Sequence, residues 1–141
     1  MNNRFIVYQN PQTDMMEVLI PCIDDINVLL KNVPKNQDGN MVPFKIIDNF
    51  PKYPETFDLK DNQIVRNRNK LHNLKKNEWR FIRKPKLEKL DIEFMKSIEV
   101  GDIVKQNEIK LKKQELRDTT DTDVSNLSDN DLENYTPAIL L

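Results

Sequence analysis

The stretch from residue 86 to residue 118, KLEKLDIEFMKSIEVGDIVKQNEIKLKKQELRD, constrains the fold of this chain more than any other part. Gly101 is a typical helix stop, and Asp102 is a typical N-cap for a second helix over 103–117. Because the connection has only these two residues, we expect the two helices to fold back as a helical hairpin. The first helix, which should end near Val100, has its apolar residues at helical spacing: Leu87, Leu90, Phe94, Met95 and Ile98.

The apolar residues of this hairpin predict a buried seam between the two helices. In the second helix, Ile109 and Leu116 lie seven residues apart, which places them on one face. We assign these residues a structural role rather than a catalytic one. The predicted seam and corner consist of Leu87, Leu90, Phe94, Ile98, Gly101, Asp102 and Leu116.

The first part of the chain has a different pattern, which predicts β-structure. Residues 4–10 and 15–21 are rich in β-branched and aromatic residues, and turn-forming residues separate them, so we expect an antiparallel hairpin. A hairpin alone is marginally stable in water. A short helix over 24–31 is predicted to cover it.

A third strand is predicted over 42–48, with Pro43 at the start of the strand or at a sheet edge. Residues 49–63 contain two prolines and are expected to be irregular. Because the chain has only two glycines, turns that require positive φ must be made by Asn and Asp.

A strongly basic segment precedes the hairpin and an acidic tail follows it. Residues 66–117 hold sixteen basic and eight acidic side chains, whereas 118–141 hold six acidic and no basic ones. From residue 63 the pattern becomes helical, and Pro85 is expected to kink this helix or to begin the next one. The segregation of charge predicts either that the tail neutralises the basic segment or that the segment faces a polyanionic partner.

These patterns together predict an α+β protein with three parts. Residues 1–62 form a small α+β subdomain based on the β-hairpin, and 63–118 form a basic helical region with the helical hairpin. Residues 119–141 form an acidic, partly flexible tail.

The sequence gives little support for catalysis or for bound cofactors. Cys22 and His72 are the only residues of their kinds, which excludes a disulfide within the chain and the usual nitrogen and sulfur zinc sites. With two glycines there is no phosphate-binding loop, and the carboxylates of the tail lack the spacing of a calcium-binding loop. We therefore expect a protein that is not an enzyme and has no cofactor or metal. Cys22 is expected to be a small buried residue, and His72 to lie on a helix face.

Binding to another macromolecule is the remaining class of function. The basic run interleaved with aromatic residues suits an acidic protein surface or a nucleic acid, but a net charge of −1 argues against nucleic acid. The helices could pack within one chain or between two, so self-association stays open. No apolar run approaches the roughly 20 residues that span a bilayer, and no membrane partner is expected. The candidate contact residues are Arg66, Arg68, Arg80, Arg83, Trp79, Ile139 and Leu140.

Residues 83–120 resemble a family of small proteins of tailed bacteriophages, the tail or tail-fibre assembly chaperones. The matching residues are Leu87, Leu90, Asp91, Phe94, Met95, Glu99, Gly101, Asp102, Ile109, Lys113, Leu116, Arg117 and Asp118. The predicted leading hairpin and the VPFKIID strand followed by Asn-Phe-Pro are also similar. The chain departs from the family where a Phe-Arg-x-x-Trp box would follow this proline, and it has Tyr135-Thr136-Pro137 in place of a terminal Trp-Pro pair.

The resemblance implies a non-enzymatic protein that binds tail or tail-fibre components during phage assembly. Such a protein would act in the cytoplasm of the host cell. Two alternatives to an assembly role remain at this point. One is a structural component of the virion tail, and the other is a nucleic-acid-binding regulator that uses the basic helix over 66–86.

Overall fold

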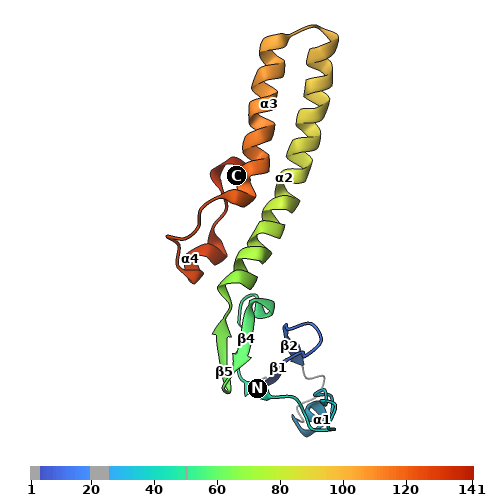
Figure 1. Ribbon diagram of the computed structural model, residues 1–141, viewed down its shortest axis with the longest axis vertical. Helices are drawn as coiled ribbons and strands as arrows, with labels where there is room; N and C mark the ends of the chain where they lie inside the picture. The colour runs from blue at the N-terminus through green and yellow to red at the C-terminus, as the bar shows by residue number, and fades with distance from the viewer. Residues whose placement is uncertain (1–3, 20–25, 50) are drawn as a thin grey trace. The chain divides into compact units, whose positions relative to one another are not determined.

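The computed structural model describes residues 4–19, 26–49 and 51–141 of the chain. It has the predicted α+β fold, with a small sheet followed by long helices (Figure 1). The chain divides into two compact units, residues 1–71 and 72–141, and each is described by itself.

The first unit is built on the predicted antiparallel hairpin. Strand β1 (Phe5–Gln9) pairs with β2 (Met16–Leu19) on one side and with β3 (Phe44–Ile47) on the other, in the order β2-β1-β3. Pro43 comes directly before β3, which is an edge strand. A proline is tolerated at this position because its missing N–H is not needed by the ladder.

The central strand is covered on both faces. Ile6 and Tyr8 alternate with Val7 along β1, and all three side chains are buried. Helix α1 (Ile26–Leu30) contributes Leu29 to the cluster around Ile6 and Tyr8, so the described part of the predicted covering helix is confirmed. The predicted start of that helix at 24–25 and Cys22 lie outside the described residues.

The prediction that 49–63 are irregular and that a helix begins at residue 63 was wrong. After the short 3₁₀ turn η1 (Pro54–Thr56), strand β4 (Phe57–Lys60) pairs with strand β5 (Gln63–Arg66) in a second antiparallel hairpin. Its turn residues, Asp61 and Asn62, have φ values of 50° and 60°. Two consecutive positive φ values suit the right-handed twist of a two-residue hairpin, and Asn and Asp tolerate them.

Polar side chains fix the second hairpin to the first within this unit. The Oε1 atom of Gln9 accepts a hydrogen bond from the amide of Leu59 (3.1 Å), while its Nε2 donates to the Asp58 carboxylate (3.3 Å). Asp58 also accepts hydrogen bonds from Asn67 (2.8 Å) and Lys70. Burial alone would raise the pKa of Asp58, but these hydrogen bonds and the charge of Lys70 together lower it.

The second unit contains most of the helical hairpin. Helix α2 (Arg68–Glu99) passes through Pro85 as one helix, so the alternative in which Pro85 begins a new helix was wrong. Pro85 is exposed, so water can hydrate the carbonyl group that lacks its N–H partner. Helix α3 (Ile103–Asp118) follows and runs back beside α2 (Figure 1).

The acidic tail is folded rather than extended. It forms the 3₁₀ turn η2 (Thr119–Asp121), helix α4 (Asp129–Asn134) and the 3₁₀ turn η3 (Ala138–Leu140). Ser128 caps α4, because its side-chain oxygen accepts a hydrogen bond from the amide of Asp131 (3.1 Å). The buried apolar side chains that the tail contributes to the second unit include Val124, Leu132 and Leu140.

Candidate interaction surface

Trp79 lies in the core of the second unit and not on a contact surface. Its side chain is fully buried, and its ring meets those of Tyr135 and His72 edge-on, at centroid distances of 6.0 and 6.3 Å. The indole N–H donates to the carbonyl oxygen of Tyr135 (3.4 Å). The assignment of Trp79 to a partner surface was therefore wrong, because the tail covers this ring.

The tail and the basic helix are in contact within the second unit. Lys75 is 4% exposed, and its Nζ donates to the carboxylate of Glu78 (2.7 Å) and to the carbonyl oxygen of Glu133 in α4 (3.1 Å). Leu140, also expected at a contact surface, is buried, whereas its neighbour Ile139 is 36% exposed. Part of the basic segment is thus occupied by the chain's own tail.

The four arginines of the predicted basic surface have different surroundings. Arg83 donates from Nη1 to the carbonyl oxygens of Leu116 (3.3 Å) and Arg117 (2.7 Å) in the last turn of α3. Arg80 is exposed and donates to Asn77 (2.7 Å). These two arginines lie in the second unit.

Arg66 and Arg68 lie in the first unit. Arg66 is in β5, where it donates to Thr56 Oγ1 (2.6 Å) and lies 4.0 Å from the centre of the Phe57 ring. Arg68 is the first residue of α2. The predicted basic helix over 66–86 is therefore shorter at its start, because Arg66 belongs to strand β5 and α2 begins at Arg68.

The predicted corner of the hairpin has the expected geometry. Gly101 has a φ of 67°, which other residues adopt at a cost. The carboxylate of Asp102 accepts a hydrogen bond from the amide of Lys105 (2.9 Å) and so caps α3. Across the two helices, Lys113 pairs with Asp91.

The seam between α2 and α3 is narrow and partly open. Ile109 and Leu116 of α3 are buried, while their counterparts on α2, Leu87, Leu90 and Phe94, are half-buried. Lysines of α3 lie over the ring of Phe94 at 5.8 Å. This arrangement leaves apolar surface of the hairpin accessible.

The assignment of Ile98 to the seam was wrong. Ile98 is 51% exposed, and the neighbouring Ser97 is buried instead, at 4% exposure. The Ser97 carbonyl accepts hydrogen bonds from the amide of Asp102 (2.9 Å) and from Gln106 Nε2 (3.4 Å). A small side chain suits this position because the backbones of the two helices converge at the corner.

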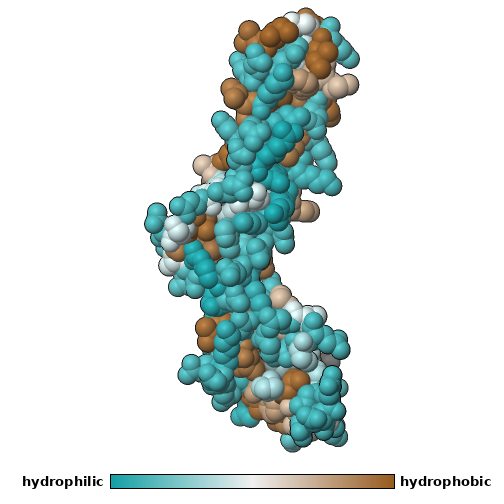
Figure 2. Space-filling view, viewed as in Figure 1, coloured by the Kyte–Doolittle hydropathy of each residue, from teal (hydrophilic) through white to brown (hydrophobic). Residues whose placement is uncertain are grey.

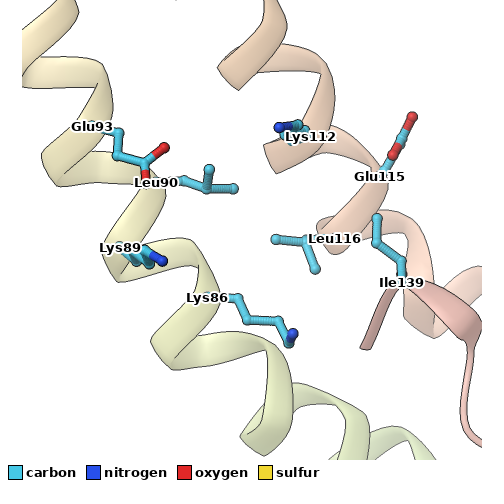
Figure 3. Close-up of a pocket in the computed structure, with 8 residues that line it drawn as sticks. All are labelled: Lys86, Lys89, Leu90, Glu93, Lys112, Glu115, Leu116 and Ile139. Atoms are coloured by element: carbon cyan, nitrogen blue, oxygen red, sulfur yellow. The ribbon is translucent and has the colours of Figure 1, made fainter. Parts of the chain in front are cut away.

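An open groove of about 410 Å³ lies between the facing helices near the C-terminus. Leu90 and Leu116 point toward each other across it, and Ile139 lies at one side (Figure 3). Charged side chains of both signs form its rim: Lys86, Lys89, Glu93, Lys112 and Glu115. Because apolar and charged side chains both line the groove, it suits a peptide that carries both kinds of group more than a small metabolite.

Six exposed apolar residues of the second unit lie on the last turns of α2 and the first turn of α3, and no prediction from the sequence assigned them to a contact surface. Figure 2 shows hydrophobic surface where α2 joins α3. We call this surface the tip patch. It consists of Ile92 (58% exposed), Met95 (63%), Ile98 (51%), Val100 (78%), Ile103 (63%) and Val104 (71%). Apart from Met95 and Ile98, these residues fall outside the helical spacing that was used to predict the seam.

Among the residues that the structure describes, no group of three or more His, Cys, Asp or Glu side chains could hold a metal ion. Within the same ranges, none of the helices has the length and apolar character needed to cross a membrane. In comparisons with known proteins, no family profile, curated protein or solved structure matches this chain.

Proposed function

We propose that this chain is a non-enzymatic bacteriophage tail or tail-fibre assembly protein that binds tail components. The observation that carries the proposal is the agreement between the residues of the family resemblance and the hairpin corner. Gly101 and Asp102 make a left-handed stop and an N-cap, and Leu116 is buried against α2. Because these residues shape the corner and are also those of the family resemblance, they support a helical hairpin common to this chain and that family.

The proposed mechanism is binding without turnover. Exposed apolar area of this kind marks surfaces that contact other macromolecules. The tip patch and the groove beside Leu90 would shield apolar surface of a tail component, or fix the geometry of a subunit, until assembly is complete. Of the contact residues expected from the sequence, Arg80 and Ile139 remain accessible.

Affinity purification from phage-producing cells tests this proposal. An affinity-tagged chain should recover tail or tail-fibre proteins, identified by mass spectrometry. A variant with Val100→Glu and Ile103→Glu should recover less of them, whereas Phe81→Glu, at an 82% exposed position away from the tip patch, should recover as much as the wild type. Recovery of no tail protein by the wild-type chain would refute the proposal.

A structural role in the virion tail is the second candidate, and the same apolar surface supports it. Quantitative mass spectrometry of purified virions separates the two. An assembly helper should be absent from mature particles, whereas a tail component should be present at a fixed ratio to the major tail protein. No observation favours nucleic-acid binding, because the only tryptophan is buried and Arg83 is engaged by α3.

A further inference from the structure

We propose that the acidic tail is an autoinhibitory cover, which hides on helix α2 a binding site for an acidic segment of another protein. The site is the face of α2 around Lys75 and Trp79, and the cover is the chain's own segment 122–141. The proposal does not rest on the proposed function, because both the site and its cover belong to this chain.

The first argument is what the cover hides. Trp79 is fully buried, its ring meets that of Tyr135 edge-on at 6.0 Å, and its indole N–H donates to the carbonyl oxygen of Tyr135 at 3.4 Å. Lys75 is 4% exposed and donates to the carbonyl oxygen of Glu133 at 3.1 Å. Tryptophan is among the residues that contribute most to binding at protein interfaces. This face of α2 therefore holds a tail segment as a binding site holds a ligand.

The second argument is that the cover has little structure of its own. Helix α4 has six residues and η3 has three, and their backbone hydrogen bonds are local. The amide of Leu132 donates to the carbonyl oxygen of Ser128 and that of Leu140 to the carbonyl oxygen of Pro137, both at 2.9 Å. Because helices this short are marginal alone, the tail keeps its fold only while its buried side chains are docked. It therefore opens as one unit, at a lower free energy than the unfolding of the helical hairpin.

The third argument, which selects an acidic protein segment as the competing occupant, is charge. Residues 72–89 of α2 hold seven basic and two acidic side chains, whereas 118–141 hold six acidic and no basic ones. A partner segment that carries carboxylates beside apolar side chains shares both features of the tail. It can take the tail's place, whereas a basic segment would be repelled.

Hydrogen exchange of the wild-type full chain, followed by NMR under native conditions, tests whether the cover opens as a unit. The Trp79 indole N–H and the Leu132 amide should have similar protection factors. Both should be at least roughly 10-fold below that of the Ile109 amide in α3, because the tail opens while the hairpin stays folded. An indole N–H as protected as the Ile109 amide would overturn the proposal, since Trp79 would then be uncovered only by global unfolding.

A fluorescently labelled synthetic peptide of residues 122–141 is the probe for the site. It should bind the full chain with Leu132→Ala and Leu140→Ala at least roughly 10-fold more tightly than the wild type, because the weakened tail leaves the site open more often. The matched control is Ile139→Ala with Leu141→Ala, at tail positions that are 36% and 86% exposed. This control should bind the peptide no better than the wild type.

A second peptide, with Asn and Gln in place of every Asp and Glu, tests the charge of the occupant. It should bind the Leu132→Ala, Leu140→Ala variant several-fold more weakly than the natural tail peptide does. Equal binding of the natural peptide to all three proteins would mean another site, and no binding to a variant that is folded by circular dichroism would mean no site. Either result, or equal binding of the two peptides, would overturn the proposal.

Discussion

Asp102 caps helix α3 by accepting a hydrogen bond from the backbone amide of Lys105 at 2.9 Å. The preceding residue, Gly101, ends the incoming segment with a φ of 67°. The chain thus reverses direction within two residues, one of which tolerates the left-handed backbone while the other satisfies an open N–H group. This corner brings the apolar faces of α2 and α3 together and exposes the tip patch around them.

Asp102→Ala should lower the free energy of unfolding by about 1 kcal/mol, because the amide of Lys105 loses its acceptor. Asp102→Asn keeps a side-chain oxygen that can accept the same hydrogen bond, so it should lower the free energy of unfolding by at most a few tenths of about 1 kcal/mol. Urea unfolding followed by far-UV circular dichroism measures both. Equal stability of the alanine variant and the wild type would mean that this cap does not hold the corner.

Gly101→Ala should lower the free energy of unfolding by about 1 kcal/mol, because alanine is strained at a φ of 67°. No atom lies within 4 Å of the position that an added Cβ would occupy, so the cost is conformational and not steric. Gly101→Asn should therefore recover part of the loss, since asparagine enters this region more readily. Thermal unfolding of the three proteins would rank them as Gly, then Asn, then Ala, and any other order would contradict the described backbone.

Trp79→Ala should destabilise the second unit by about 3–5 kcal/mol, because it removes a fully buried ring from beneath the tail. Phe81→Ala, two residues further along α2, is the matched control and should change stability by no more than about 0.5 kcal/mol, since Phe81 is 82% exposed. Trp79 is the single tryptophan, so its fluorescence reports directly on this site. A folded chain with red-shifted emission that acrylamide quenches freely would show that the ring is accessible.

Tyr8 should make stability depend on alkaline pH. Burial of the phenol, with the hydrogen bond and negative charge of Glu17, raises the pKa of Tyr8 from 10.0 to about 12. Because the folded state favours the neutral phenol, this contribution is complete below pH 10 and is lost as the pH rises toward 12.

The Tyr8→Phe variant isolates this effect from the titration of lysines in the same range. The difference in unfolding free energy between the wild type and Tyr8→Phe should shrink as the pH rises from 10 to 12. Urea unfolding of both proteins across this range gives the difference directly. A constant difference would mean that the phenol ionises alike in the folded and unfolded states.

The sequence predicted those elements whose signals are local and regular. The spacing of Leu87, Leu90 and Phe94, followed by Gly101-Asp102, was sufficient to predict the helical hairpin. Two runs rich in β-branched and aromatic residues, separated by turn formers, predicted β1 and β2. The second β-hairpin was missed because nearby prolines suggested irregular chain, although Asp61 and Asn62 are a turn pair of the expected kind.

Burial between distant segments was harder to predict. Trp79 lies within a basic run, and no periodic pattern indicates that Tyr135, 56 residues away, covers its ring. Ile98 follows the helical spacing of the seam, but the converging backbones at the corner favour the smaller Ser97. These outcomes depend on tertiary packing, which helical spacing alone does not define.

We propose that this chain serves the assembly of phage tails by binding, and a phage that carries a deletion of its gene tests this proposal most directly. Negative-stain electron microscopy of the resulting lysates should show filled heads with tails or tail fibres missing or malformed. Supplying the wild-type chain in trans should restore complete particles, and the Val100→Glu, Ile103→Glu variant should restore fewer. Complete, infectious particles from the deletion phage would contradict the account.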